Sequence, residues 1–148
     1  MDLILWRHAE AHEGTPDAER KLTAKGKHQA RRVAKWLRKR LPRDARILAS
    51  PAVRAQRTAR ELTRRFETVA AVGLSARAEG LLKAAGWPGA GEVTVVVVAH
   101  QPTLGEAAAL ALTGRAAPWS LHKGALIWIE APAGGDATLV AAITPDLV

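Results

Sequence analysis

The feature that most constrains the fold is the run TVVVVA at residues 94–99, which has four consecutive valines and no charge. LILW at residues 3–6 is a second uninterrupted apolar run, and RILA at residues 46–49 is a shorter, mostly apolar one. Short runs that are apolar on both faces are typical of central strands in a parallel sheet covered on both sides. We therefore predict an α/β fold with a mostly parallel central sheet.

Helical patterns separate these strands. After Thr23, a predicted N-cap, apolar residues recur at helical spacing as far as Leu41, and Pro42 follows as a stop. Ser50-Pro51 predicts the start of a second helix with the serine as its cap.

Further helices are expected over residues 76–85 and 103–112, and two closing strands over 126–130 and 138–143. The alternation of strands and helices predicts βαβ units in a three-layer α/β/α sandwich. No linker divides the 148 residues, so we expect one domain over residues 1–148.

The amino-acid composition excludes several classes of protein function. There is no cysteine, which excludes disulfides, thiol catalysis and cysteine-bound zinc. No apolar run is long enough to span a membrane, and the N-terminus does not resemble a secretory signal, so we expect a cytoplasmic protein.

Positive charge is concentrated in one part of the chain. Residues 20–65 contain 17 of the 22 lysines and arginines but only two of the 14 acidic residues, Asp44 and Glu61. This imbalance indicates either an anionic partner or a solvated helix face. The five tryptophans are scattered and there is no tyrosine, so no stacking platform for bases is evident and we do not expect a nucleic acid partner.

Chemically useful side chains follow three of the predicted strands. His8 comes after LILW, His100 follows the valine run, and Arg54 lies in the first turn of the helix that begins after RILA. Because the carboxyl ends of parallel strands meet at one edge of a sheet, and ligands bind there, we expect these side chains to lie together. Arg7 precedes His8, and arginine suits the grip of phosphate oxygens.

The stretch LILWRHAEAHE allows a metal site as an alternative. If residues 7–12 stayed extended, His8, Glu10 and His12 would share one face and could bind a cation. His-x-Glu segments of zinc deaminases also require cysteine ligands, which this chain lacks. A phosphate site around Arg7 and His8 is therefore favoured over a metal site, and no metal or cofactor is expected.

Four segments together resemble the histidine phosphatase superfamily, which includes the phosphoglycerate mutases, and in particular its short SixA-type branch. They are LILWRHAEA, DAERKLTAKGKHQA, SPAVRAQRTA and VVVVAHQPTLG, in the order expected for the family. Ala9 stands where the family usually has glycine. The resemblance extends from the first strand to beyond His100 and implies a phosphoglycerate mutase-like fold.

The resemblance also implies roles. His8 would be the nucleophile that receives the phosphoryl group, while Arg7, Arg54 and His100 would hold its oxygens. Arg20 stands where the short branch often has an arginine that could reach substrate, but it could equally be one surface arginine among many.

No acid that would protonate a leaving group is evident from the sequence. Glu10 and Glu79 are the candidates, although Glu10 could instead make a structural hydrogen bond. A phosphorylated imidazole can take its own proton before it leaves, whereas an alkoxide needs an acid. We therefore predict a metal-independent phosphatase of protein phosphohistidine.

Two alternatives remain open. One is a phosphatase of small phosphate esters at the same site, and the other is a basic module that binds polyanions and has an idle active site. The expected partner is thus a phosphorylated protein or a small phosphorylated substrate.

Overall fold

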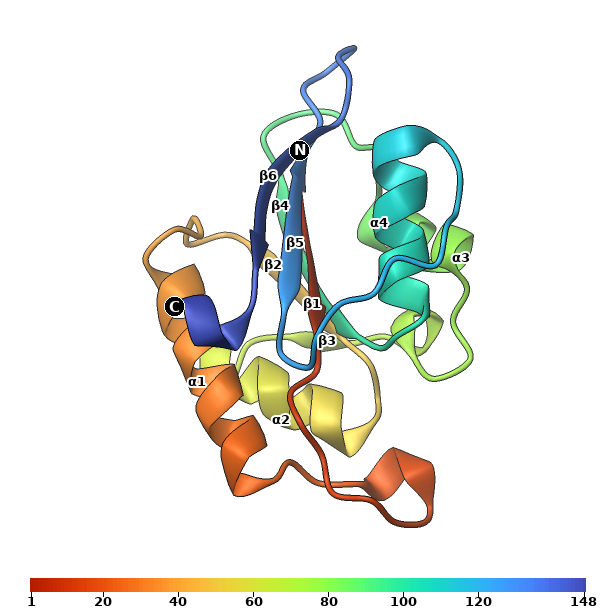
Figure 1. Ribbon diagram of the computed structural model, residues 1–148. Helices are drawn as coiled ribbons and strands as arrows, with labels where there is room; N and C mark the ends of the chain where they lie inside the picture. The colour runs from red at the N-terminus through yellow and green to blue at the C-terminus, as the bar shows by residue number, and fades with distance from the viewer.

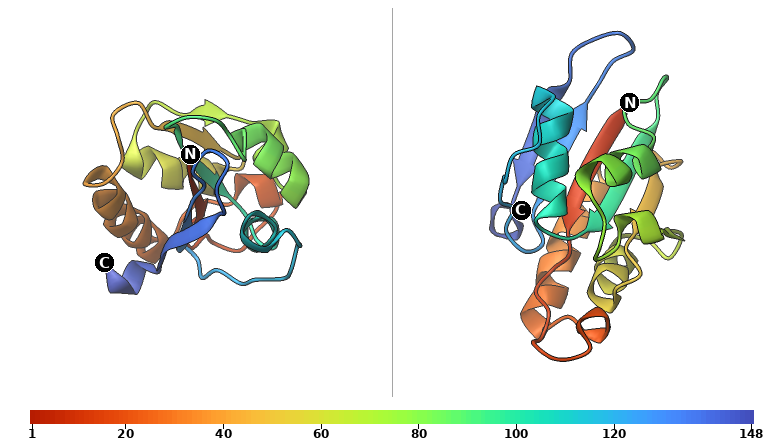
Figure 2. Two further views of the ribbon diagram at one scale, coloured as in Figure 1. Left: turned by 90° about the horizontal axis from the view of Figure 1, so that it is seen from above. Right: turned by 90° about the vertical axis from the view of Figure 1, so that its right-hand side faces the viewer.

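The structure is a computed structural model that describes residues 1–148, with one central sheet covered by helices on both faces (Figures 1 and 2). The strands are β1 (Asp2–Arg7), β2 (Arg46–Ala49), β3 (Glu67–Thr68), β4 (Thr94–Ala99), β5 (Leu126–Glu130) and β6 (Thr138–Ile143). The α-helices are α1 (Ala24–Arg38), α2 (Val53–Leu62), α3 (Ala78–Ala85) and α4 (Thr103–Thr113). Three short 3₁₀ helices complete the chain: η1 (Asp17–Glu19), η2 (Ala70–Val72) and η3 (Pro145–Leu147).

The six strands are arranged in the order β3-β2-β4-β1-β5-β6. β4 pairs in parallel with both β1 and β2, and β3 pairs in parallel with β2. β5 and β6 are antiparallel and form the other edge. The predicted α/β sandwich with a mostly parallel sheet is therefore confirmed, and all six residues of the valine-rich strand β4 are buried on both faces.

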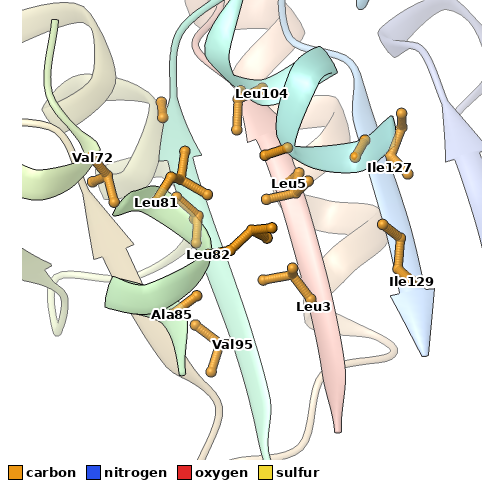
Figure 3. Close-up of a cluster of buried hydrophobic side chains, with 14 of the residues drawn as sticks. Leu3, Leu5, Val72, Leu81, Leu82, Ala85, Val95, Leu104, Ile127 and Ile129 are labelled. Atoms are coloured by element: carbon orange, nitrogen blue, oxygen red, sulfur yellow. The ribbon is translucent and has the colours of Figure 1, made fainter. Parts of the chain in front are cut away.

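Two apolar cores lie on the two faces of the sheet. On one face, β-strand side chains such as Leu3 and Leu5 pack against Leu81 of α3 and Leu104 of α4 (Figure 3). On the other face, α1 and α2 contribute Val33, Leu37, Ala55 and Ala59 to a second core that includes Trp6 of β1. The helices on both faces therefore hold β1 and β4 in place, and with them the residues that follow these strands.

The predicted elements differ from the observed ones mainly at helix starts. The second helix begins at Val53, with Ala52 at its N-cap, so the prediction that Ser50 caps it is wrong. The Ser50 hydroxyl instead accepts from the Ala52 amide at 3.1 Å and lies 2.7 Å from the His100 ring. The third helix begins at Ala78 rather than at residue 76.

The predicted cap of α1 is confirmed. The Thr23 hydroxyl accepts a hydrogen bond from the Gly26 amide at 2.9 Å, as a helix N-cap does. α1 ends at Arg38, so Leu41 follows the helix and packs against the core from outside it. None of the helices has the length and hydropathy needed to cross a membrane.

Candidate active site

The parallel pairing of β1 with β4 brings two of the predicted histidines together. Arg7 and Ala99, the last residues of the two strands, are paired in register, so His8 and His100 follow at the same edge of the sheet. Their ring centroids are 5.2 Å apart. Arg54, the second residue of α2, reaches this edge, and its Nε lies 3.2 Å from His8 Nε2.

Both ring nitrogens of His8 have partners. Nδ1 donates to the Ala9 carbonyl oxygen at 2.7 Å, and Nε2 accepts from Arg54 Nε. A carbonyl only accepts and Nε of arginine only donates, so the proton of a neutral His8 lies on Nδ1 and the lone pair on Nε2. Burial lowers the pKa of His8 to about 3, against the pull of the Ala9 hydrogen bond, and the nearby His100, Arg54 and Arg7 lower it further. His8 is thus a neutral imidazole at neutral pH.

His100 lies beside His8 and keeps one ring nitrogen without a partner. Its Nε2 lies 2.7 Å from the Ser50 hydroxyl, whereas its buried Nδ1 has no hydrogen bond. Burial and the charge of Arg54 lower the pKa of His100 to about 4, with Asp17 acting in the opposite direction. The Ser50 hydroxyl accepts from the Ala52 amide and can either donate to or accept from His100 Nε2; when it donates, the proton of a neutral His100 lies on Nδ1.

Arg7 extends from the end of β1 toward the loop before β5. Its Nη1 donates to the Leu121 carbonyl oxygen at 2.7 Å, while its buried Nε has no partner. Burial, and then the charge of Arg54, lower the pKa of Arg7 from its ordinary value. Arg7 also lines a cavity of about 460 Å³ together with Glu10, Lys25 and His122. Arg7 and Arg54 therefore place two positive charges around two neutral histidines.

Arg54 has an unpredicted partner, Asp17 of η1. Arg54 Nη1 donates to the Asp17 carbonyl oxygen at 2.8 Å, and Nη2 donates to Asp17 Oδ2 at 3.1 Å. Hydrogen bonds from Arg20 and Arg54 hold the pKa of the Asp17 carboxyl below its usual range. Sequence reasoning missed Asp17 because loop positions follow no period, and its spacing three residues before Arg20 was the one available signal.

Arg20 bonds to Asp17 and not to His8 or His100. Its Nη1 lies 3.0 Å from Asp17 Oδ1, its Nε donates to the His12 carbonyl oxygen at 2.7 Å, and Glu13 is 3.8 Å away. The side chain of Arg20 thus joins the site through the carboxylate that Arg54 also binds.

The two candidate acids lie in different surroundings. Glu10 Oε1 accepts from the Thr23 hydroxyl at 3.0 Å, and Lys25 Nζ is 3.9 Å from Oε2, so Glu10 is tied to the start of α1. Glu79 is exposed in the first turn of α3 and has no hydrogen bond or ion pair through its side chain. Neither acid has a hydrogen bond to His8.

The alternative metal site does not form. No group of three or more histidine, aspartate or glutamate side chains lies close enough to hold a metal ion, so His8, Glu10 and His12 do not form a ligand set. The chain turns away from extended alternation after β1, and the Ala9 amide donates to Thr58 Oγ1 while the Glu10 amide donates to Gln29 Oε1. These bonds fix the loop that follows His8 to α2 and α1.

Ala9 fits this loop without strain. Its side chain is fully buried in a small cluster with Leu22 and Ala30. Thr58, which receives the Ala9 amide, itself donates to the Arg54 carbonyl oxygen at 2.8 Å. The main-chain amide of residue 9 therefore joins the loop after His8 to α2, and the Ala9 methyl group packs in the small cluster.

The fold and the edge cluster define the class: an α/β sandwich with an arginine–histidine centre at the carboxyl edge of its parallel strands. The family model of the histidine phosphatase superfamily (branch 1) matches residues 3–77, half of the chain. The chain therefore belongs to the histidine phosphatase superfamily, as the resemblance predicted.

Solved structures agree over nearly the full length. The protein histidine phosphatase SixA complexed with tungstate is similar with a TM-score of 0.80 and 23% identity, covering 99% of this chain and 98% of that one. A protein of Agrobacterium tumefaciens provisionally assigned as phosphohistidine phosphatase SixA has a TM-score of 0.78 and 26% identity over 97% of both chains. Phosphoserine phosphatase from Entamoeba histolytica has a TM-score of 0.69 and 19% identity over 99% of both chains. No curated protein sequence matches the chain.

Proposed function

We propose that the protein is a metal-independent phosphatase that hydrolyses protein phosphohistidine through a phosphoryl intermediate on His8. One observation above all supports this. Only two buried side-chain polar atoms lack a hydrogen-bond partner, Arg7 Nε and His100 Nδ1, and both belong to residues around His8. Such atoms are rare because each costs free energy, and both are suited to donate to the oxygens of a bound phosphoryl group.

In the proposed reaction, Arg54 Nε gives up its hydrogen bond to His8 Nε2, and the freed lone pair on Nε2 attacks the phosphorus atom. A bond forms between Nε2 and phosphorus while the bond to the leaving group breaks, and the leaving group keeps that electron pair. Arg7, Arg54 and His100 would bind the peripheral oxygens, where the charge of the transferring group lies. The oxygen of a water molecule then bonds to the phosphorus of phospho-His8, and the Nε2–phosphorus bond breaks with its electron pair returning to Nε2. The water proton passes to solvent, phosphate is released and the neutral imidazole is regenerated.

The surroundings of the candidate acids favour a phosphohistidine substrate. Glu10 is tied to Thr23 and Lys25, and Glu79 is exposed with no side-chain hydrogen bond or ion pair, so neither is bonded to His8 in this state. A phosphorylated imidazole can accept a proton on its own ring before it leaves, whereas an alkoxide requires a positioned acid. Glu10, which lines the same cavity as Arg7, remains our first candidate for a leaving-group acid, and Glu79 the second.

The relatives support the same substrate class, since the structure with a TM-score of 0.80 is a protein histidine phosphatase complexed with tungstate, a tetrahedral oxyanion. We accordingly propose a phosphorylated protein as the partner, a single domain over residues 1–148 and a cytoplasmic location. The likeness to phosphoserine phosphatase keeps ester hydrolysis as the competing activity to be measured.

The test compares substrates and metals in one assay. The chain is incubated with a protein bearing phosphohistidine and with an alkyl phosphate, each with and without a chelator. We expect faster release of phosphate from phosphohistidine, unaffected by chelation, and none with His8→Ala. A preference for the alkyl phosphate would instead make the protein an ester phosphatase. Loss of activity on chelation that zinc or manganese restores would support His8, Glu10 and His12 as metal ligands. No turnover of either substrate would favour the alternative with an idle active site.

A further inference from the structure

Asp17 occupies a place that a phosphate-binding site would keep for its ligand. Of the acidic side chains, Asp17 alone bonds to Arg54, and it does so through both its main-chain carbonyl oxygen and its carboxylate. Arg54 Nε donates to His8, so all three nitrogens of the guanidinium already have a partner. Three of its five N–H groups are thus used, and Asp17 takes one from each terminal nitrogen, so a phosphoryl group bound bidentately through these nitrogens would share them with Asp17 and lie beside its carboxylate.

The charges around His8 and His100 also indicate that Asp17 stands in the place of an anionic ligand. Arg54 is almost fully buried and Arg7 partly buried beside two neutral histidines, and Asp17 is the one acidic side chain bonded to Arg54, so without Asp17 the Arg54 charge would have no negative partner. Buried charges are costly unless they are paired. Asp17 is thus the counter-ion of the centre in the absence of substrate.

The three side chains at the centre are almost fully buried. The exposed fractions of His8, Arg54 and His100 are 7%, 4% and 5%. The η1 segment lies below the carboxyl end of β1 and beside α2, as Figures 1 and 2 show, and its Asp17 is the residue that covers Arg54. Because Asp17 contacts both terminal nitrogens of Arg54, its departure would open this side chain to a substrate phosphoryl group.

We propose that the phosphoryl group replaces Asp17 on Arg54, and that Asp17 thereby sets the affinity of the site for phosphoryl dianions. This inference rests on the proposed function, because it assumes that Arg54 grips phosphate oxygens. Arg20 completes the exchange: it binds the other carboxylate oxygen, Asp17 Oδ1, at 3.0 Å and can keep Asp17 after Arg54 has released it. Asp17 is here a specificity-determining residue and not a catalytic one.

The test measures the binding of tungstate by calorimetry to the wild type, Asp17→Asn and Glu19→Gln. Asp17→Asn removes the competing charge at nearly constant size. Glu19→Gln removes one charge from the same η1 segment, where Glu19 is exposed and has no ion pair, and is the matched control. We expect Asp17→Asn to lower the dissociation constant by about fivefold, the upper range for a partly exposed ion pair, and Glu19→Gln to leave it unchanged. An unchanged or raised dissociation constant in Asp17→Asn would overturn the proposal, and so would an equal decrease in both variants.

Arg54→Ala separates this proposal from the proposed function. If Arg54→Ala abolishes tungstate binding while Asp17→Asn binds like the wild type, Arg54 is the phosphate clamp and Asp17 does not compete for it. If Arg54→Ala binds tungstate as the wild type does, the clamp itself is wrong and the proposed function falls with it.

Discussion

At the scale of single residues, His8 differs from a surface histidine because its environment fixes its protonation. The Ala9 carbonyl holds the proton on Nδ1, and burial lowers the pKa to about 3, so Nε2 keeps its lone pair at neutral pH. A neutral, oriented imidazole is what a nucleophile toward phosphorus requires. Arg54, at 3.2 Å from Nε2, is the nearest positive charge available to a phosphoryl group on that atom.

Substitution of Arg54 tests this arrangement. Arg54→Ala should lower the turnover of phosphohistidine by about 10²–10³-fold, the usual loss when one donor to a developing oxyanion is removed. Arg54→Lys should recover only part of this loss, because an ammonium group cannot form the bidentate fork. Steady-state kinetics measure both effects, and circular dichroism checks that the fold is retained. Full activity of Arg54→Lys would show that Arg54 does not grip phosphate oxygens in this way.

The sequence placed His8, Arg54 and His100 at one edge because each follows a predicted strand, and parallel strands end together. It did not reveal Asp17 or the role of Ser50. Asp17 lies in a loop, where no period links a residue to its neighbours in space, and Ser50 contacts a residue 50 positions away. A serine before a proline has the pattern of a helix cap, and only the tertiary structure shows that His100 uses its hydroxyl.

At the scale of elements, α1 holds the loop that follows His8. Gly26, in the first turn of α1, packs so closely against Glu10 that a Cβ atom there would overlap the Glu10 carbonyl oxygen. The same carbonyl accepts from the Thr23 amide at 3.0 Å. Glycine at position 26 therefore sets how near α1 comes to the site.

Two alanine substitutions test this contact. Gly26→Ala should lower the free energy of unfolding by about 1–3 kcal/mol, as overpacking does, and should reduce activity because the loop after His8 must shift. Gly80→Ala in α3 is the matched control, since a Cβ atom there meets nothing within 4 Å. It should raise the free energy of unfolding by about 0.5–1 kcal/mol, because alanine favours a helix over glycine, and leave activity unchanged. Urea denaturation gives both values, and equal stability of the two variants would contradict the close packing.

Strands were more predictable than helix starts. β2, β4, β5 and β6 match their predicted bounds because short apolar runs have few alternative pairings. The two-residue strand β3 was missed, since both of its residues are exposed and neither its length nor its hydropathy distinguishes it from a loop. The antiparallel edge of β5 and β6 agrees with the turn-rich segment between them.

At the scale of the whole molecule, the basic surface of the helices and the candidate active site lie in different places. α1 and α2 pack side by side on one face of the sheet and bring most of the basic half of the chain to that face (Figure 1). Their N-terminal ends meet the site, while their exposed lysines and arginines face solvent. Burial lowers the pKa values of His8 and His100 at the edge of the sheet, between the two helix layers.

These shifts make stability depend on pH. The folded pKa values of about 3 for His8 and about 4 for His100 lie below the ordinary value of 6.5. Between these limits the unfolded chain binds more protons than the folded one, so stability falls as the pH falls from about 6.5 toward about 4. Each histidine contributes a slope of up to about 1.4 kcal/mol per pH unit.

Urea denaturation at several pH values between about 4.5 and 6.5 measures this slope. His100→Gln should reduce it relative to the wild type, whereas His28→Gln, at an exposed position of α1, should not. A wild-type slope that His100→Gln leaves intact would contradict the neutral, buried state of His100.

The most direct test of the account is to identify the phosphoryl intermediate. The enzyme is mixed with a protein carrying labelled phosphohistidine, quenched in alkali during turnover, and its labelled residue is located. We expect an acid-labile, alkali-stable label on His8 that appears and decays at rates matching turnover, and none in His8→Ala. Turnover without any enzyme-bound label, or a label that persists in His8→Ala, would contradict the proposal that His8 is the nucleophile.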